Sequence, residues 1–287
     1  MGNSSGNDSS HPPGEQGGLE LIRRNTAIVL VRARNPANIG AVARAMHDFG
    51  FGSLRVVNEF PVPFEAARSA VDASAVLASA TGHASLAEAV ADCTLVLGTS
   101  AVGERELRHQ LLELPEGAGL IRAHVAQSDG RVALLFGSEK TGLSNDELSF
   151  CHALVTIPMA EHPGLRHPSM NLGQAVAVCL WELVRERSSG STRDEARALN
   201  GAAGEIATQA PADSATLERL HALLTEVLEA TGYTRRHSAN CDPAEIRRLI
   251  RRMGVDSATA PVVDSATAPV WMGIFRQVLW KLGCERK

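Results

Sequence analysis

Five short apolar runs, separated by helical segments, limit the fold of this chain more than any other feature. The runs occupy residues 27–31, 54–57, 94–97, 132–136 and 154–157, and alanine-rich segments with helical spacing occupy residues 38–49, 66–80, 86–91 and 171–187. Strands that alternate with helices form a mostly parallel sheet, because each crossover helix returns the chain to the same edge of the sheet. The sequence therefore predicts an α/β fold with helices on both faces of a parallel sheet.

The 287 residues are enough for one large domain and an extension. Composition divides the chain into four parts: a disordered tail over 1–24, the α/β domain over 25–188, a flexible Ser/Gly/Ala-rich linker over 189–213, and a small helical extension over 214–287. The helices of the extension are expected at residues 214–230, 243–253 and 270–282. An identical octapeptide occurs at 255–262 and again at 263–270, which is typical of an insertion tolerated in a surface loop.

Several classes of protein are disfavoured by what the sequence lacks. No apolar run is long enough to cross a bilayer, and the N-terminus has no secretory signal, so we expect a cytoplasmic protein without a membrane partner. The five cysteines are far apart and form no cluster with histidine, which argues against a zinc site or a disulfide framework. We expect reduced, buried thiols and no bound metal.

Charge is unevenly distributed along the chain. The net charge is −4, but residues 231–287 contain ten Lys or Arg and only five Asp or Glu. An acidic body with a basic end predicts that a polyanion is bound by that end, and it gives no reason to expect DNA as a partner. Helical spacing places Arg247, Arg248, Arg251 and Arg252 on one face, which we expect to be exposed and to bind phosphate groups.

The first candidate motif is Asn-Pro-Ala-Asn-Ile-Gly-Ala-Val-Ala-Arg at residues 35–44. It places Asn38 near the start of a helix, where backbone N–H groups are free and ligands are often bound. Arg44 lies further along the same helix among small residues that leave room for a ligand. Taken alone, Arg44 is better explained as an ordinary solvated surface arginine.

The second candidate motif covers residues 135–144, where a strand ends at Gly137 and a turn contains Glu139. Gly137 is expected to let the backbone approach a ligand that a Cβ atom would obstruct. A nucleotide-binding phosphate loop is excluded because Leu143 occupies the position of its lysine. Ser144 and Glu147 form a capping-box pattern, so a plain capped turn explains this pair without a functional role.

The third candidate motif covers residues 168–176 and precedes an apolar helix. Ser169 and Asn171 stand at the helix start, where a simple capping role is the alternative to a functional one. The helix carries an apolar stripe at core spacing, formed by Leu172, Val176, Cys179, Leu180 and Leu183. A further strand end, at residues 97–101, has the same character as the second motif.

These motifs, in this order, closely resemble those of the SpoU/TrmH-type RNA ribose methyltransferases of the SPOUT superfamily, most closely the TrmJ branch. The resemblance covers about residues 25–188 and, more weakly, the C-terminal extension. It implies a parallel α/β domain whose C-terminal part forms a trefoil knot, S-adenosyl-L-methionine as the cofactor, and a homodimer with active sites at the subunit interface.

The resemblance also implies roles for particular residues. The catalytic residue is Arg44, and the catalytic set is completed by Asn38, Glu139, Ser169 and Asn171. The cofactor pocket would be formed by Thr99, Ser100, Ala101, Gly137, Ile157, Met170 and Leu172. Met170 departs from the family pattern, which usually has leucine at this position.

The reaction implied by the resemblance is 2′-O-methylation of a ribose in tRNA, at nucleotide 32 of the anticodon loop in TrmJ-like enzymes. Two alternatives stay open: the same chemistry on ribosomal RNA, and a non-catalytic RNA-binding module that keeps the fold. The helical extension favours tRNA, because it is similar to the C-terminal part of TrmJ-type proteins. The complete set of motif residues favours an enzyme.

Overall fold

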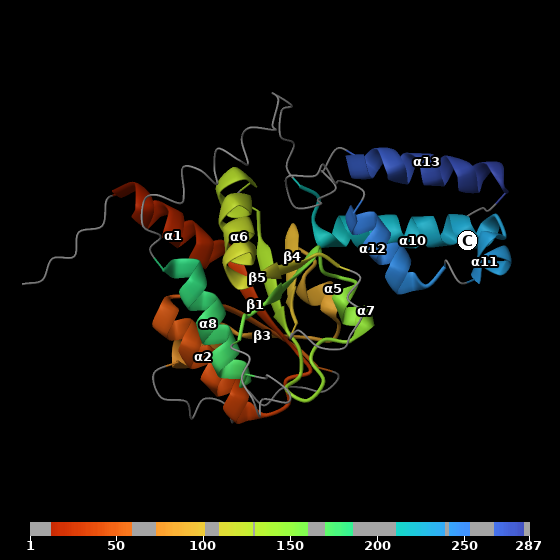
Figure 1. The fold of residues 1–287 in the computed structure, drawn as a ribbon. Coiled ribbons are helices and arrows are strands. Elements are labelled where there is room, and N and C mark those ends of the chain that lie inside the picture. Colours follow the sequence, from red (N-terminus) through yellow and green to blue (C-terminus); the bar gives the residue numbers. More distant parts are fainter. Residues whose placement is uncertain are drawn as a thin grey trace, which may run out of the picture.

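The computed structural model describes residues 13–58, 73–100, 109–128, 130–159, 170–185, 211–238, 241–252 and 267–283. Its centre is a seven-stranded sheet in the order β3-β2-β1-β6-β4-β7-β5, and every strand pairing is parallel (Figure 1). The strands are β1 (Thr26–Val31), β2 (Ser53–Val57), β3 (Thr81–His83), β4 (Leu95–Thr99), β5 (Leu111–Glu113), β6 (Val132–Phe136) and β7 (Ala153–Thr156). The predicted parallel α/β sheet is confirmed, and the five longer strands are the five apolar runs.

The sequence did not predict the two edge strands, β3 and β5. Each has only three residues, none of them fully buried, so neither carries the continuous apolar run that marks a strand buried on both faces. They form because Arg55 on β2 and Leu154 on β7 pair with them and complete the hydrogen-bond ladder at each edge.

Helices cover both faces of the sheet (Figure 1). One core cluster joins the sheet to five of them, α1 (Pro13–Asn25), α2 (Pro36–Phe49), α4 (Ser74–Ser79), α6 (Leu114–Ser128) and α8 (Leu172–Val184). A second cluster on the other face contains residues of α5 (Leu86–Ala89) and α7 (Asn145–Leu148). The apolar stripe predicted on α8 is confirmed as core, since its five residues are all at most 5% exposed.

Two predictions about helices need correction. The tail over 1–24 was expected to be disordered, but residues 13–24 belong to α1, and residues 1–12 lie outside the described part. The helix forms because Ile22 is buried in the core and Arg23 donates to the carbonyl of Phe49 at 3.1 Å. The helix expected over 66–80 is described only as α4, with residues 59–72 outside the description, and α6 was not predicted.

The C-terminal extension folds into its own small helical unit, seen at the right of Figure 1. It consists of α10 (Ser214–Ala230), α11 (Tyr233–Arg236), α12 (Pro243–Arg252) and α13 (Thr267–Lys281), so the three predicted helices are present. A separate core of Leu217, Leu220, Ile250 and Phe275 joins α10, α12 and α13. The linker prediction falls mostly on residues 186–210, and the octapeptide repeat mostly on residues 253–266, which both lie outside the described residues.

The arginines of α12 do not form the exposed phosphate-binding surface that the sequence predicted. Arg248 and Arg251 are only 6% and 1% exposed, and their guanidinium groups donate to the carbonyls of Asn145 and Phe150 at 2.8 and 3.0 Å. Arg247 lies over the ring of Phe150, 4.3 Å from its centroid. The expected exposure is therefore wrong for these three residues, while their contact with RNA phosphates stays a prediction. The side chain of Arg252 lies outside the described residues.

The error has a physical reason, which is that α12 is buried on two sides. Ile246 and Ile250 pack into the helical unit, while the neighbouring arginine face meets the segment that begins with α7. Glu218 on α10 is the counter-charge of two of these arginines. Its carboxylate accepts from Arg247 at 3.1 Å and from Arg251 at 3.0 Å. Leu249, expected on the packed side, is 53% exposed. Sequence periodicity cannot distinguish a charged face toward solvent from one toward another domain.

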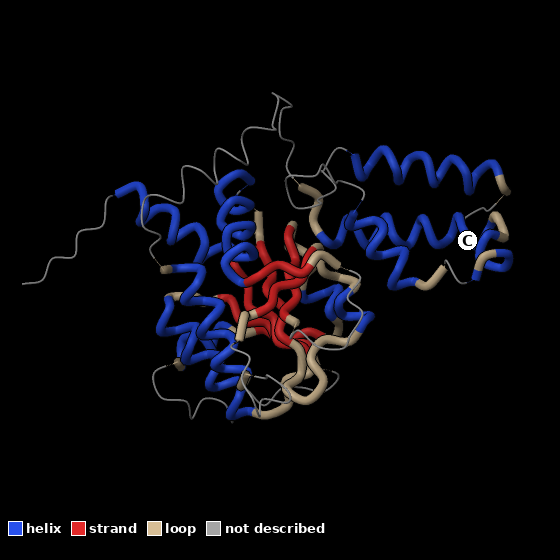
Figure 2. Tube along the Cα trace, viewed as in Figure 1, coloured by secondary structure: helices blue, strands red, loops and turns tan. Residues whose placement is uncertain are grey.

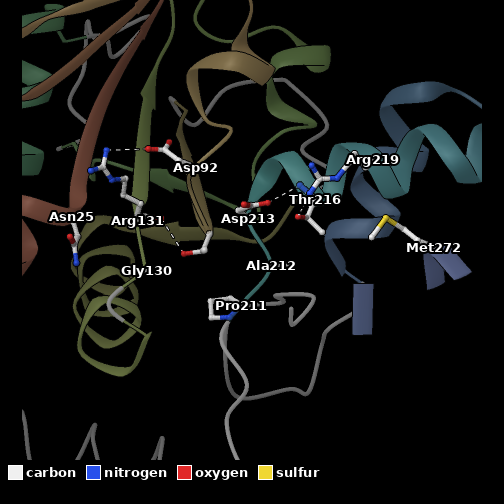
Figure 3. A pocket seen from close by; sticks show the side chains of 11 residues that line it. Asn25, Asp92, Gly130, Arg131, Pro211, Ala212, Asp213, Thr216, Arg219 and Met272 are labelled. Carbon is white, nitrogen blue, oxygen red and sulfur yellow. Dashed lines mark hydrogen bonds and ion pairs between the residues drawn. The ribbon is translucent and has the colours of Figure 1, made fainter. Parts of the chain in front are cut away.

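A cavity of about 560 Å³ lies where the helical unit meets the amino-terminal edge of the sheet (Figure 3). Its wall includes Arg131, Asp92 and Asp213, and Figure 3 shows Arg131 directed toward Asp92. Burial alone would raise the pKa of Asp92, but the hydrogen bond and charge of Arg55 bring it below its usual value. The charge of Asp92 is therefore balanced by Arg55 and Arg131, and none of the predicted site residues lines the cavity.

Two further expectations concern the path of the chain. The trefoil knot stays a prediction, because residues 101–108 and 160–169 on the relevant path lie outside the described residues. Within the described ranges, none of the helices has the length and apolar character needed to span a membrane.

The shared carboxylate of Glu218 generates a stability prediction. Burial lowers the pKa of Arg251 and Glu218 opposes this effect, so Glu218→Gln would leave a buried guanidinium without its counter-charge. We expect the free energy of unfolding to fall by up to about 3 kcal/mol, the lower end of the cost of breaking a buried ion pair. Urea unfolding followed by tryptophan fluorescence measures this change. Glu229→Gln on the exposed end of α10 is the control, and equal effects of both variants would contradict the prediction.

Candidate active site

The candidate site lies at the carboxyl edge of the sheet, where four neighbouring strands end. In the order β1-β6-β4-β7 these strands run parallel, so the segments that follow them meet at one edge. Loops gather there below the sheet in Figure 2. All three motifs and the Thr99 strand end follow these four strands, which explains how residues more than a hundred positions apart in sequence become neighbours.

Asn38 and Glu139 are in direct contact. Asn35 caps α2 by accepting from the backbone N–H of Ala37 at 3.0 Å, and Pro36 occupies the first helical position. This start places Asn38 in the first turn of α2, where its Nδ2 donates a hydrogen bond to Oε1 of Glu139. The structure therefore brings the first and second motifs together, 101 residues apart, although their catalytic role stays a prediction.

The second motif forms a tight loop between β6 and α7. Gly142 has a φ of 64° and its N–H donates to the carbonyl of Ser138 at 2.8 Å. A Cβ atom on Gly137 would overlap the backbone of Gly142 and Leu143. Glycine is thus required at 137 so that the loop can fold back on itself, and its role in cofactor binding stays a prediction.

The third motif begins α8 beside α2. Asn171 caps α8 by accepting from the N–H of Gly173 at 3.0 Å, and a Cβ on Gly173 would meet Cβ of Ala41 at 2.8 Å. The two helices therefore approach closely at their amino-terminal ends, which places Asn171 near the helix of Asn38. Ser169 lies outside the described residues. Capping explains Asn171 fully in structural terms, so its catalytic role also stays a prediction.

Arg44 is exposed on α2, one turn beyond Ala41, which faces α8. Its guanidinium forms no hydrogen bond or ion pair with any of the residues that the structure describes. By contrast, Arg32 at the same edge and Arg251 in the helical unit are held by carboxylates. Arg44 therefore has a charge available to a substrate.

The predicted cofactor residues surround the same strand ends. Thr99 donates to the carbonyl of Leu135 at 2.9 Å, and the N–H of Ser100 donates to Val155 at 2.9 Å, so the end of β4 is tied to both of its neighbours. Three apolar side chains lie at the following segments: Ile157 and Met170 are half-buried, and Leu172 is buried. Ala101 is outside the described residues.

Sequence reasoning missed Arg32, the residue directly after β1. It has a positive φ of 59°, and its side chain forms an ion pair with Glu147 at 2.7 Å. Glu147 was visible in the sequence only as half of a capping box, which the structure confirms. Nothing local marks Arg32, because its partner is 115 residues away.

Other reactive side chains are buried in unreactive forms. Burial raises the pKa of Cys93, Cys151 and Cys179 to about 12, so these thiols stay protonated, in agreement with the expected structural cysteines. Burial also lowers the pKa of His152 to about 3 and of His124 to about 4. Neither group is suited to act as a general base for a substrate, because both side chains are buried.

Comparison with known proteins gives one consistent result. The model of the SpoU rRNA Methylase family matches residues 25–181. The tRNA (cytidine/uridine-2′-O-)-methyltransferase TrmJ of Sodalis glossinidius is 36% identical over 234 residues, covering 81% of this chain and 86% of the relative. The TrmJ of Cronobacter sakazakii is 37% identical over 235 residues, covering 82% and 91%.

Solved structures agree with the sequence relatives. The crystal structure of TrmJ from Z. mobilis ZM4 matches with a TM-score of 0.67 at 27% identity, covering 88% of this chain and 98% of that one. A probable methyltransferase from Bordetella pertussis matches with a TM-score of 0.52 at 31% identity, covering 58% and 97%. The matched region contains all three motifs and the strand ends that carry them, and this chain belongs to the SpoU methylase family.

Proposed function

We propose that this protein transfers a methyl group from S-adenosyl-L-methionine to the 2′-hydroxyl of a ribose in tRNA, and that it does so in the cytoplasm. The observation that carries the proposal is the contact between Asn38 and Glu139 at the carboxyl edge of the sheet, next to the start of α8. The named function of the TrmJ relatives, which match over most of the chain, points to the same reaction. By the resemblance to that branch, the target is nucleotide 32 of the anticodon loop.

The residues at the strand ends fit an adenosyl cofactor. Thr99, Ser100 and Gly137 offer backbone and hydroxyl groups, and Ile157, Met170 and Leu172 offer an apolar wall for the adenine. The backbone of the folded 137–142 loop also lies at this edge of the sheet. The cofactor supplies an electrophilic methyl group on its sulfonium, and the protein's task is to align the ribose hydroxyl with it.

Arg44 is the catalytic residue of this proposal. A guanidinium stays protonated at neutral pH, so it is poorly suited to remove a proton from the hydroxyl. It is well suited to bind a neighbouring phosphate with two hydrogen bonds and to stabilise the negative charge that develops on the 2′-oxygen. Asn38, Glu139, Ser169 and Asn171 complete the set, with Glu139 held by Asn38.

The alternative substrate is ribosomal RNA, which the name of the family model mentions. The TrmJ relatives match over 234 and 235 residues of this chain, which is more than the methyltransferase domain of residues 25–188 contains, so the match extends beyond that domain. A non-catalytic RNA-binding role would not require the complete set of Asn38, Arg44, Glu139, Ser169 and Asn171. We therefore favour tRNA methylation over both alternatives.

The function is tested by incubating the protein with tritium-labelled S-adenosyl-L-methionine and either unmodified tRNA or unmodified ribosomal RNA. We expect label in tRNA only, on the ribose of nucleotide 32 after mapping. Label in ribosomal RNA alone would establish the alternative substrate. Absence of label in both, with a correctly folded protein, would favour the non-catalytic module.

Binding and catalysis should separate in two variants. Arg44→Ala should bind S-adenosyl-L-methionine as the unaltered protein does, but lose about 10²- to 10³-fold in turnover, the usual effect of removing one charge-stabilising donor. Gly137→Val should abolish cofactor binding, because the side chain would displace the backbone of Gly142. Titration calorimetry and the methyl-transfer assay measure the two effects. Arg24→Ala, an exposed arginine at the opposite edge of the sheet, is the control, and lost cofactor affinity in a folded Arg44→Ala protein would refute the roles.

The active form should be a homodimer that buries the outer side of α8. Trp181 on this helix is 52% exposed, while the opposite side of α8 is buried in the core, so the helix is more apolar than one core face requires. Light scattering at micromolar concentration should give about twice the 30.4 kDa of one chain. Trp181→Glu should shift the mass toward one chain, and Trp280→Glu on α13 is the matched control. A single-chain mass for the unaltered protein would rule the dimer out.

A further inference from the structure

Arg32 occupies an unusual backbone position. Among the described residues it is the only non-glycine with a positive φ, at 59°, in the left-handed region that L-residues with bulky side chains avoid. Its N–H still donates to the carbonyl of Val57 at 2.8 Å, so the ladder between β1 and β2 continues through the turn. A residue held in a disfavoured conformation at the end of a central strand calls for a compensating interaction.

The compensating interaction is made by the guanidinium group. Nε and Nη2 donate to the two carboxylate oxygens of Glu147 at 2.7 and 2.9 Å, and Nη2 also donates to the carbonyl of Gly142 at 2.9 Å. The Arg32 side chain is 33% exposed and that of Glu147 is 15% exposed. This two-pronged geometry is specific to arginine, because lysine has a single nitrogen.

The two partners of Arg32 are Gly142, in the second motif, and Glu147, in the helix that follows it. Glu147 also accepts from the N–H of Ser144 at 2.6 Å, which fixes the start of α7. Gly142 is the residue that folds back onto Gly137 and bonds to Ser138. Arg32 thus ties the carboxyl-terminal end of the 137–142 loop and the start of α7 to the end of β1, and the part of the loop before Gly142 carries Glu139, which meets Asn38.

We propose that Arg32 is a positioning residue that holds the 137–142 loop closed at the cofactor site. Through Gly142 it fixes the backbone that faces the cofactor, and through the loop it sets Glu139 against Asn38. The inference rests on the proposed function, since it assumes that S-adenosyl-L-methionine binds at this edge. The competing explanation is a surface ion pair that only adds stability to the fold.

Arg32→Gly separates the two explanations. Glycine adopts this φ freely, so the substitution relieves the backbone strain while it removes the guanidinium. If the closed loop then falls to a tenth of the molecules, the dissociation constant for S-adenosyl-L-methionine rises about tenfold. We expect this rise, with an unchanged or higher thermal midpoint and with an unchanged Michaelis constant for tRNA.

Three further variants complete the experiment. Glu147→Gln keeps a capping side chain for α7 but loses the charge, and should raise the dissociation constant without adding to the effect of Arg32→Gly. Arg32→Lys should bind S-adenosyl-L-methionine with intermediate affinity, because lysine keeps the positive charge but cannot form the two-pronged ion pair. Arg131→Gln breaks a surface ion pair with Asp92 at the opposite edge and should leave cofactor binding unchanged.

The outcomes distinguish this inference from the proposed function. If the unaltered protein does not bind S-adenosyl-L-methionine in calorimetry, the proposed function fails. If it binds, and Arg32→Gly binds with the same affinity, only the role of Arg32 fails. If Arg32→Gly and Arg131→Gln both lose cofactor affinity in proportion to their loss of thermal stability, Arg32 has only a structural role and the inference is overturned.

Discussion

The segment from Ser144 to Phe150 is the point on which the arrangement of this protein depends. On one side, Glu147 accepts the forked ion pair of Arg32 from the end of β1. On the other side, Arg248 and Arg251 of the C-terminal unit donate to the carbonyls of Asn145 and Phe150. One short stretch of chain therefore connects the central sheet, the loop of the candidate site and the helical extension.

This arrangement explains how a protein with an acidic body accommodates the basic helix α12. The charges of α12 are balanced inside the molecule, by Glu218 and by backbone carbonyls, and they serve to dock one unit on another. Burying a charge is favourable only where such partners are present. The helical unit is thus joined to the segment that directly follows the second motif, so the extension and the loop of the candidate site both contact this segment.

The parts of the site that sequence could predict are those with a local signature. The Ser144–Glu147 capping box, the apolar stripe of α8 and the five central strands all depend on residues close together in the chain, and each was predicted correctly. Edge strands β3 and β5 escaped prediction because three residues with little burial carry no periodic pattern. Helix α1 escaped because its stability depends on contacts with the core, such as that of Ile22.

By itself the sequence determined the class of fold, the five central strands and the family, because apolar periodicity and short motifs are properties of neighbouring residues. Only the tertiary structure decided which of these residues meet. It brought Asn38 into contact with Glu139, and Arg32 into contact with Glu147, although each pair is more than a hundred residues apart in sequence. It also buried Arg248 and Arg251 of α12. The physical reason is that a charged side chain takes its role from the partner it finds in space, and the chain encodes that partner only through the whole fold.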